Sequence, residues 1–74
     1  MADQTIDAKG LQCPGPIVAT FKAMKEMQPG DGLTVEATDR GFIKDIEAWC
    51  RKTGNKLLSL EDSGDIITAK IEKV

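Results

Sequence analysis

The residue best suited to chemistry in this chain is Cys13, which stands in the run GLQCPGP at residues 10–16. At the first turn of a helix, unpaired amides and the helix dipole can lower a cysteine pKa from about 8.5 into a range of roughly 3.5 to 7.5. Pro14 and Pro16 suit such a turn, because their torsions fit a helix and their missing amides would have had no partner there. We therefore expect the sulfur of Cys13 at a helix N-terminus.

The chain around Cys13 should be rigid and should leave the thiol accessible to another protein. The two prolines stiffen the turn, and Gly15 adds no side chain that would crowd the sulfur. The amides of Gly15 and Ile17 remain as donors. The alternative is that Cys13 is a small buried hydrophobe, as free cysteines often are, but a double-proline start would then have no packing purpose.

The rest of the composition restricts what this thiol can do. The chain has two cysteines and no histidine. It therefore lacks the usual base of a thiol protease, a Cys-X-X-Cys redox pair, a disulfide scaffold and a zinc ligand set. A lone activated thiol can still attack a sulfane sulfur, hold it as a persulfide and release it to the next nucleophile. Such chemistry needs neither a cofactor nor a metal, and we expect none.

Cys50 and Trp49 lie in a predicted helix, where their positions indicate packing. Cys50 shares an apolar stripe with Ile43 and Ile46, in mid-helix where no free amides are available. We interpret it as a core residue, with a resolving thiol as the alternative. Trp49 is interpreted as an edge-of-core residue whose indole nitrogen reaches water, with partner binding as the alternative.

The periodicity of apolar residues predicts six elements in the order strand, helix, strand, helix, strand, strand. The predicted strands span residues 5–8, 33–38, 56–61 and 66–72. The first helix is predicted over residues 14–28, with an apolar stripe of Ile17, Phe21, Met24 and Met27, widened by Val18. The second should run from an N-cap at Thr38-Asp39 to a left-handed C-cap at Gly54.

These elements predict the fold class α+β: a two-layer α/β sandwich of order βαβαββ. Right-handed crossovers place both helices on one face of a four-stranded mixed sheet, and the last two strands form an antiparallel hairpin. The other face of the sheet should be exposed to solvent. The residues predicted to point outward from it are Thr5, Asp7, Thr34, Glu36, Thr68 and Lys70.

Asp39 is the second candidate for the site. It follows a strand whose carboxyl end should lie on the same sheet edge as Cys13, where open α/β sheets usually place their sites. We favour helix capping as its role, with a part in the chemistry as the alternative. Lys9 could add positive charge over the thiol, although a solvated loop lysine is the favoured interpretation.

Composition and charge exclude several classes of function. The chain has 74 residues, with 10 basic and 12 acidic side chains and a net charge of -2, so we expect one domain over residues 1–74 and no nucleic-acid partner. No run reaches the roughly 20 apolar residues of a membrane span, and the start lacks the pattern of a signal peptide. We expect a cytoplasmic monomer without membrane contact.

Residues 7–16, of sequence DAKGLQCPGP, resemble the Cys-Pro-X-Pro signature of the TusA/SirA-like sulfur carrier family. Further landmarks agree along the chain. Met27-Gln28-Pro29-Gly30 resembles the family's interhelix loop, Asp39 with Gly41-Phe42 the entry to its second helix, and Trp49-Cys50 its aromatic-cysteine pair. The resemblance covers the chain from Thr5 to Val74.

The resemblance implies a small cytosolic persulfide carrier with a sandwich like that of the C-terminal domain of translation initiation factor three. Cys13 would bear the sulfur, supported by Pro14, Gly15, Pro16 and Asp39. The implied partners are a sulfur donor of the desulfurase or rhodanese type and a DsrE-like acceptor. A thiouridine-forming relay for transfer RNA and sulfur oxidation both fit.

Three positions depart from the pattern of the family. Gln12 stands where some members have arginine, and Gly15 where several have glutamate, so the charge that steers partners toward Cys13 should differ. Arg40 replaces a proline that often follows the equivalent aspartate. This last departure weakens the case that Asp39 does more than cap a helix.

Two other classes of function compete with a sulfur carrier. One is a non-catalytic regulatory or interaction module, in which Cys13 is a packing residue or a redox sensor. The other is a small metal chaperone, but one exposed cysteine without histidine is a poor ligand set.

Overall fold

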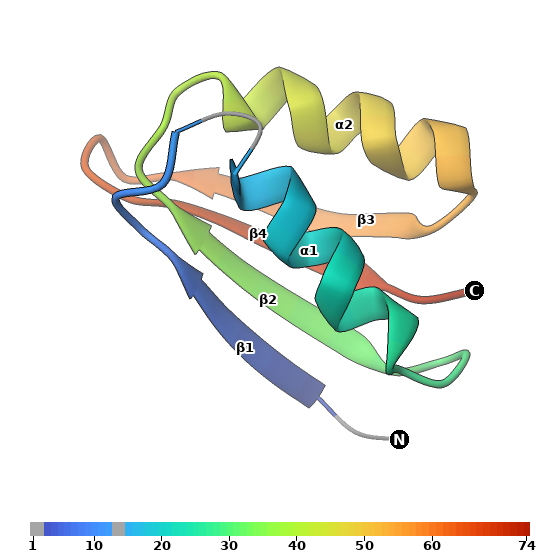
Figure 1. Ribbon diagram of the computed structural model, residues 1–74. Helices are drawn as coiled ribbons and strands as arrows, with labels where there is room; N and C mark the ends of the chain where they lie inside the picture. The colour runs from blue at the N-terminus through green and yellow to red at the C-terminus, as the bar shows by residue number, and fades with distance from the viewer. Residues whose placement is uncertain (1–2, 13–14) are drawn as a thin grey trace.

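Two helices lie side by side on one face of a four-stranded sheet in the computed structural model, which describes residues 3–12 and 15–74 (Figure 1). The elements follow in the order β1 (Asp3–Ala8), α1 (Gly15–Lys25), β2 (Gly32–Ala37), α2 (Phe42–Thr53), β3 (Lys56–Asp62) and β4 (Ile67–Glu72). The sheet order is β1-β2-β4-β3. The predicted α+β sandwich with a mixed sheet is confirmed.

Strand directions bring three loops to one edge of the sheet. β1 and β2 are parallel, whereas β4 pairs antiparallel with both β2 and β3. Ala8 is therefore in register with Ala37, Ala37 with Ile67, and Ile67 with Asp62. We call this side the carboxyl edge. Both helices start there and end at the opposite edge, because each must carry the chain back along the sheet.

The core lies between the sheet and the two helices. In α2, Phe42, Ile46 and Cys50 are buried at a spacing of four residues, as the periodicity predicted. The buried hydrophobic residues are Ala8, Met24, Met27, Leu33, Val35, Ala37, Phe42, Ile46, Cys50, Ile67, Ala69 and Ile71. Neither helix of the described residues has the length and apolar character that a membrane span needs.

Helix α1 buries only part of the predicted stripe, of which Met24 is buried and Ile17 is partly buried. Its buried residues are Pro16, Thr20 and Met24, while the predicted stripe members Val18 and Phe21 remain 44% and 48% exposed. Burial of Thr20 is tolerated because its hydroxyl donates a 2.8 Å hydrogen bond to the carbonyl of Pro16. The predicted stripe was wrong at Val18 and Phe21, and two large apolar side chains are left on the surface of α1.

The end of α1 is secured from the far end of the chain. The regular helix stops at Lys25, three residues before the predicted end at Gln28. Beyond it, the ammonium of Lys73 donates to the carbonyls of Met24 and Met27, at 2.6 Å each. A cation at a helix C-terminus satisfies unpaired carbonyls and complements the helix dipole.

The end of α2 agrees with its prediction, whereas the β3–β4 hairpin contains an irregularity. Gly54 adopts a left-handed conformation (φ 82°), and its N–H donates to the carbonyl of Cys50, which confirms the predicted C-cap. A shift in register between Leu57 and Ser59 interrupts the β3–β4 hairpin and was not predicted. It leaves Leu58 57% exposed.

The different burial of two isoleucines in α2 predicts different losses of stability when each is shortened. Ile46→Val removes one methylene from a fully buried site, so the free energy of unfolding should fall by about 1 kcal/mol. Ile43→Val is the matched control, with the same substitution in the same helix at a partly buried site, and should cost less than half as much. Urea unfolding of both variants measures the difference, and equal losses would contradict this account of the core.

Candidate functional site

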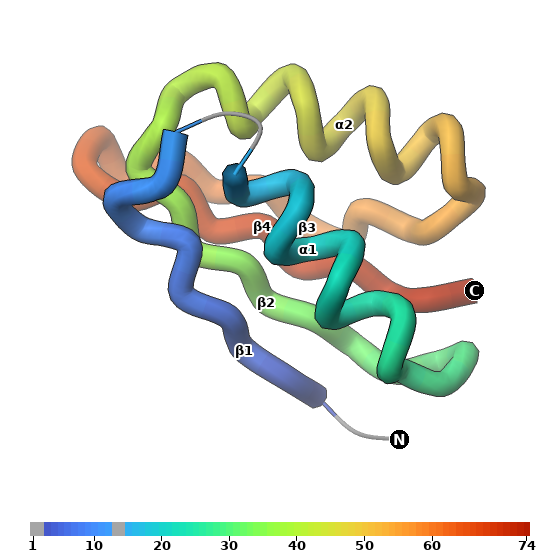
Figure 2. Tube along the Cα trace, viewed as in Figure 1, coloured from blue at the N-terminus to red at the C-terminus, as the bar shows by residue number. Residues whose placement is uncertain are grey.

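The loops at the carboxyl edge are joined to one another by hydrogen bonds. After β1 the chain turns at Gly10 (φ 83°), whose N–H donates a 3.0 Å hydrogen bond to the hydroxyl of Thr38. This bond ties the loop that follows β1 to the loop that follows β2, and the two loops lie side by side in Figure 2. The chain on the N-terminal side of residue 13 is thereby held at the edge.

Cys13 and Pro14 lie outside the described residues, so the predicted state of the thiol stays a prediction. Their neighbours are placed: Gln12 ends the loop after β1, and Gly15 begins α1. The N–H of Gly15 donates to the carbonyl of Gln12 at 2.6 Å. The described residues on either side of positions 13–14 therefore belong to the loop after β1 and to the start of α1.

The two other supporting residues of this segment, Gly15 and Pro16, have structural roles. The N–H of Gly15 is engaged by Gln12, so the prediction that it would serve as a donor to the sulfur was wrong. A Cβ at Gly15 would lie 3.1 Å from the Cβ of Leu11, a close approach that favours glycine. Pro16 is buried against the sheet. Of the two predicted donors, the amide of Ile17 remains a candidate.

Asp39 lies in the turn that precedes α2. Its carboxylate accepts a 3.1 Å hydrogen bond from the N–H of Gly41, and its carbonyl accepts one from the N–H of Phe42 at 3.0 Å. The regular helix starts only at Phe42, with Gly41 in the N-cap position and no side-chain cap. The predicted N-cap at Thr38-Asp39 was thus misplaced, because a short turn intervenes and Asp39 caps that turn instead.

An ion pair at the carboxyl edge was missed by the sequence reasoning. The guanidinium of Arg40 donates two hydrogen bonds to the carboxylate of Asp62, at 2.8 and 2.5 Å. These bonds, with one from the N–H of Gly64, hold the pKa of Asp62 below its ordinary value. No local pattern in the sequence linked Asp62 to Arg40, which is 22 positions away.

Lys9 is paired rather than projecting over the site. Its ammonium lies 3.4 Å from the carboxylate of Glu36 and 3.7 Å from that of Asp7. These side chains remain partly exposed to solvent, so the pairs contribute little to stability. The pairing favours the interpretation of Lys9 as an ordinary surface lysine.

Cys50 is a buried thiol, 4% exposed, on the sheet side of α2. Burial raises its pKa from an ordinary value of 9.0 to about 11. The neutral thiol is a weak nucleophile. These properties support the packing interpretation of Cys50 over that of a resolving thiol. Among residues 3–12 and 15–74, no group of three or more potential metal-ligand side chains is gathered.

The raised pKa of Cys50 predicts a pH dependence of stability. The folded state holds the thiol proton more tightly than the unfolded chain, so this stabilisation is complete below pH 9 and is lost as the pH rises through about 11. In a Cys13→Ser background, the free energy of unfolding should therefore decline more steeply over this window than in the same protein carrying Cys50→Ala. Parallel declines of the two variants would show that Cys50 titrates normally.

Comparison with known proteins agrees with this arrangement. Residues 4–73 match the family model described as "Sulfurtransferase TusA". The chain is 49% identical to the putative sulfur carrier protein YrkI of Bacillus subtilis, over 97% of this chain and 96% of that protein. It is 44% identical to the sulfur carrier protein TusA of Allochromatium vinosum, over 84% and 82% of the two chains.

A solved structure shows the same fold. The crystal structure of a SirA-like protein from Desulfitobacterium hafniense superposes with a TM-score of 0.81 at 27% identity, covering 93% of this chain and 95% of that one. The shared element order and the match along nearly the whole length leave one assignment. The chain belongs to the TusA family of sulfur carrier proteins.

Proposed function

We propose that this chain carries sulfane sulfur as a persulfide on Cys13 and passes it from a donor protein to an acceptor protein. The observation that supports this most is that Gln12 ends the loop after β1 and Gly15 begins α1, on either side of position 13, in a chain of the TusA family. A helix N-terminus favours the thiolate form of a cysteine. Pro14, Gly15, Pro16 and Asp39 support the site by shaping the chain around it.

The proposed transfer needs no external oxidant or reductant. The thiolate of Cys13 attacks the outer sulfur of a donor persulfide, R–S–SH, and a new S–S bond forms on Cys13. The donor S–S bond breaks, its electron pair leaves with the donor as the thiolate R–S⁻, and the proton stays on the transferred sulfur. An acceptor thiolate then repeats the same exchange on the loaded carrier. A low pKa at Cys13 serves both steps, since it supplies the attacking thiolate and makes it a better leaving group.

We propose two partner proteins, a sulfur donor of the desulfurase or rhodanese type and a DsrE-like sulfur acceptor. We propose no direct contact with nucleic acid or with a membrane. The chain would act in the cytoplasm as a monomer without a bound cofactor. The family assignment supports a sulfur carrier role, and these finer choices extend it. Cys50 has no part in the proposed transfer, because its thiol is buried and neutral.

The first test is loading of the thiol. After incubation with inorganic polysulfide and removal of the excess, intact mass spectrometry should find added sulfur on Cys13, because only its thiolate is expected to be accessible. Dithiothreitol should remove it. Cys50→Ala is the matched control and should load like the parent protein.

The second part of the test is the Cys13→Ser variant, which should gain no sulfur under the same conditions. If the folded Cys13→Ser variant still loaded while Cys50→Ala did not, the sulfur would reside on Cys50 and the proposal would be wrong. Failure of the parent protein to load under conditions that load a small-molecule thiol would also refute it.

Two substitutions distinguish a positioning role of Asp39 from a role of its negative charge in the chemistry. Asp39→Asn keeps a side-chain oxygen for the N–H of Gly41, so the turn should persist and the loading rate should stay within about twofold of the parent. Asp39→Ala removes that acceptor, and we expect a loss of stability of about 1 kcal/mol, typical of a lost cap, together with slower loading. Stopped loading in a folded Asp39→Asn variant would mean that the carboxylate charge takes part in the chemistry.

A further inference from the structure

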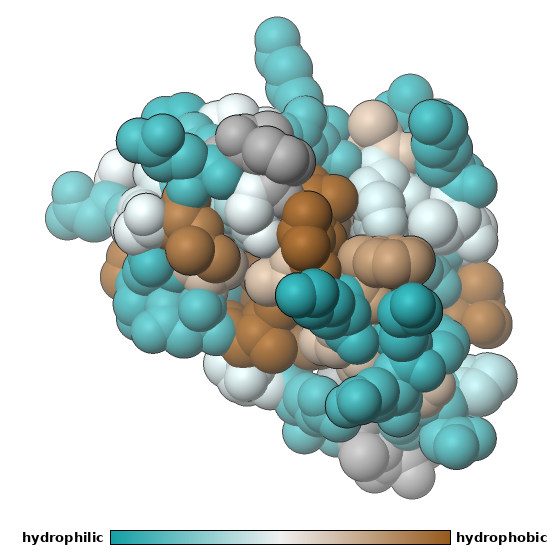
Figure 3. All heavy atoms as spheres, viewed as in Figure 1, coloured by the Kyte–Doolittle hydropathy of each residue, from teal (hydrophilic) through white to brown (hydrophobic). Residues whose placement is uncertain are grey.

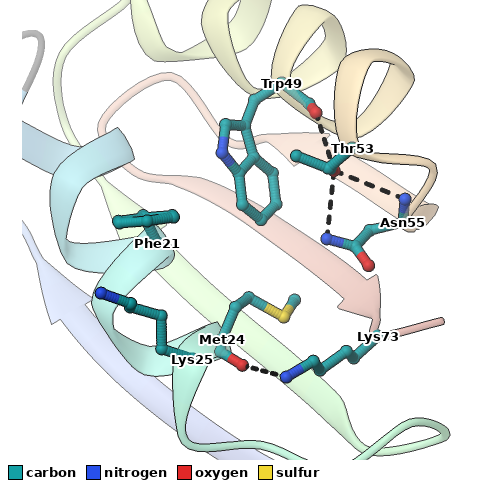
Figure 4. Close-up of a pocket in the computed structure, with 7 residues that line it drawn as sticks. All are labelled: Phe21, Met24, Lys25, Trp49, Thr53, Asn55 and Lys73. Carbon is teal, nitrogen blue, oxygen red and sulfur yellow. Dashed lines mark hydrogen bonds between the residues drawn. The ribbon is translucent and has the colours of Figure 1, made fainter.

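A shallow pocket lies between the two helices, toward the edge opposite the site. Its volume is about 200 Å³, and its lining residues are Phe21, Met24, Lys25, Trp49, Thr53, Asn55 and Lys73. Figure 4 shows the indole of Trp49 reaching from α2 toward α1, with Phe21 and Met24 across from it. Small-molecule sites usually measure about 300 Å³ or more, so this pocket is better matched to one large side chain of a protein.

The pocket continues into an exposed apolar strip on α1. Phe21 and Val18 are the two side chains that the sequence placed in the core and the structure leaves at the surface. Figure 3 shows hydrophobic atoms gathered over α1 and toward α2, bordered by hydrophilic side chains. Apolar patches rimmed by polar groups commonly mark interaction sites on soluble proteins.

The charged side chains that line this pocket are both positive. Its two charged lining residues are Lys25 and Lys73. Helix α1 contains no acidic residue, and neither do residues 48–60, although the chain as a whole has a net charge of -2. The last turns of α1 and α2 add Lys22, Arg51 and Lys52. A ligand that complements this region must carry negative charge beside an apolar group.

The two lining cations are held in place rather than free in solvent. The ammonium of Lys25 stacks over the ring of Phe21, 5.0 Å from its centroid. Lys73 gives two of its three donors to the carbonyls of Met24 and Met27, which leaves one for a ligand. Cations that are already ordered lose less side-chain entropy when they bind a carboxylate.

We propose that this groove docks an acidic segment of a sulfur-transfer partner, with one large apolar side chain in the pocket and flanking carboxylates on Lys25 and Lys73. The inference rests on the proposed function, because a carrier must bind the proteins between which it moves its cargo. Phe21 lies about 9 Å along the helix axis from Gly15, at 1.5 Å per residue. A partner anchored there can bring its own sulfur to residue 13 without covering it.

The test uses short peptides and the fluorescence of Trp49, which is direct because the chain has one tryptophan and no tyrosine. The probe has a central leucine flanked by two glutamates on each side; one control replaces leucine by serine and another replaces the glutamates by lysines. In a Cys13→Ser background, we expect a saturable change with the probe and at least about tenfold weaker binding of both controls.

Matched variants assign the binding to the groove. Phe21→Ala should weaken the probe about tenfold, whereas Leu58→Ala removes an equally exposed apolar side chain that does not line the pocket and should have no effect. Lys25→Gln should weaken the probe and flatten its dependence on salt.

Three outcomes would overturn the docking proposal: no fluorescence change at millimolar peptide, equal binding of the serine or lysine controls, or self-association of the chain that Phe21→Ala abolishes. Loading by inorganic polysulfide needs no docked partner, so it reports on Cys13 independently of the groove. Loading without peptide binding would therefore reject the groove alone, and peptide binding without loading would reject the carrier function alone.

Discussion

Parallel pairing of β1 with β2 is the constraint on which the rest of the structure depends. Parallel strands need a crossover, so α1 must begin where β1 ends and return the chain to the opposite edge. The N-terminus of α1 is thereby brought to the carboxyl edge together with the loop after β2. The hydrogen bond from Gly10 to Thr38 then ties these two loops together. The loop after β1 and the first residue of α1 meet at this edge because of the topology.

The way α1 rests on the sheet has a second consequence. Pro16, Thr20 and Met24 follow one another at intervals of four and form the buried face of the helix, which packs on β1 and β2. The larger Val18 and Phe21 are turned outward, and Lys73 fastens the far end of the helix. The buried residues of α1 and its exposed apolar residues thus lie on different sides of one short helix.

The carboxyl edge shows why a site is harder to predict than a fold. Asp39 was correctly placed beside the edge, but whether its carboxylate caps α2 or the turn before it depends on one extra turn that no periodicity reveals. Gly15 was expected to donate to the sulfur, yet its N–H bonds to Gln12. The pairing of Arg40 with Asp62 joins residues that are 22 positions apart in the sequence, and only the tertiary structure brings them together.

The order of residues by itself determined the six elements, the mixed sheet with both helices on one face and the left-handed cap at Gly54, because these follow from local spacing and turn chemistry. Tertiary structure alone decided which side of α1 is buried, how Thr20 satisfies its hydroxyl, and which cations border the pocket. The physical reason is that the apolar stripe of a helix shows how much apolar surface the helix can bury. Which of its residues are buried depends on the shape of the sheet against which the helix packs.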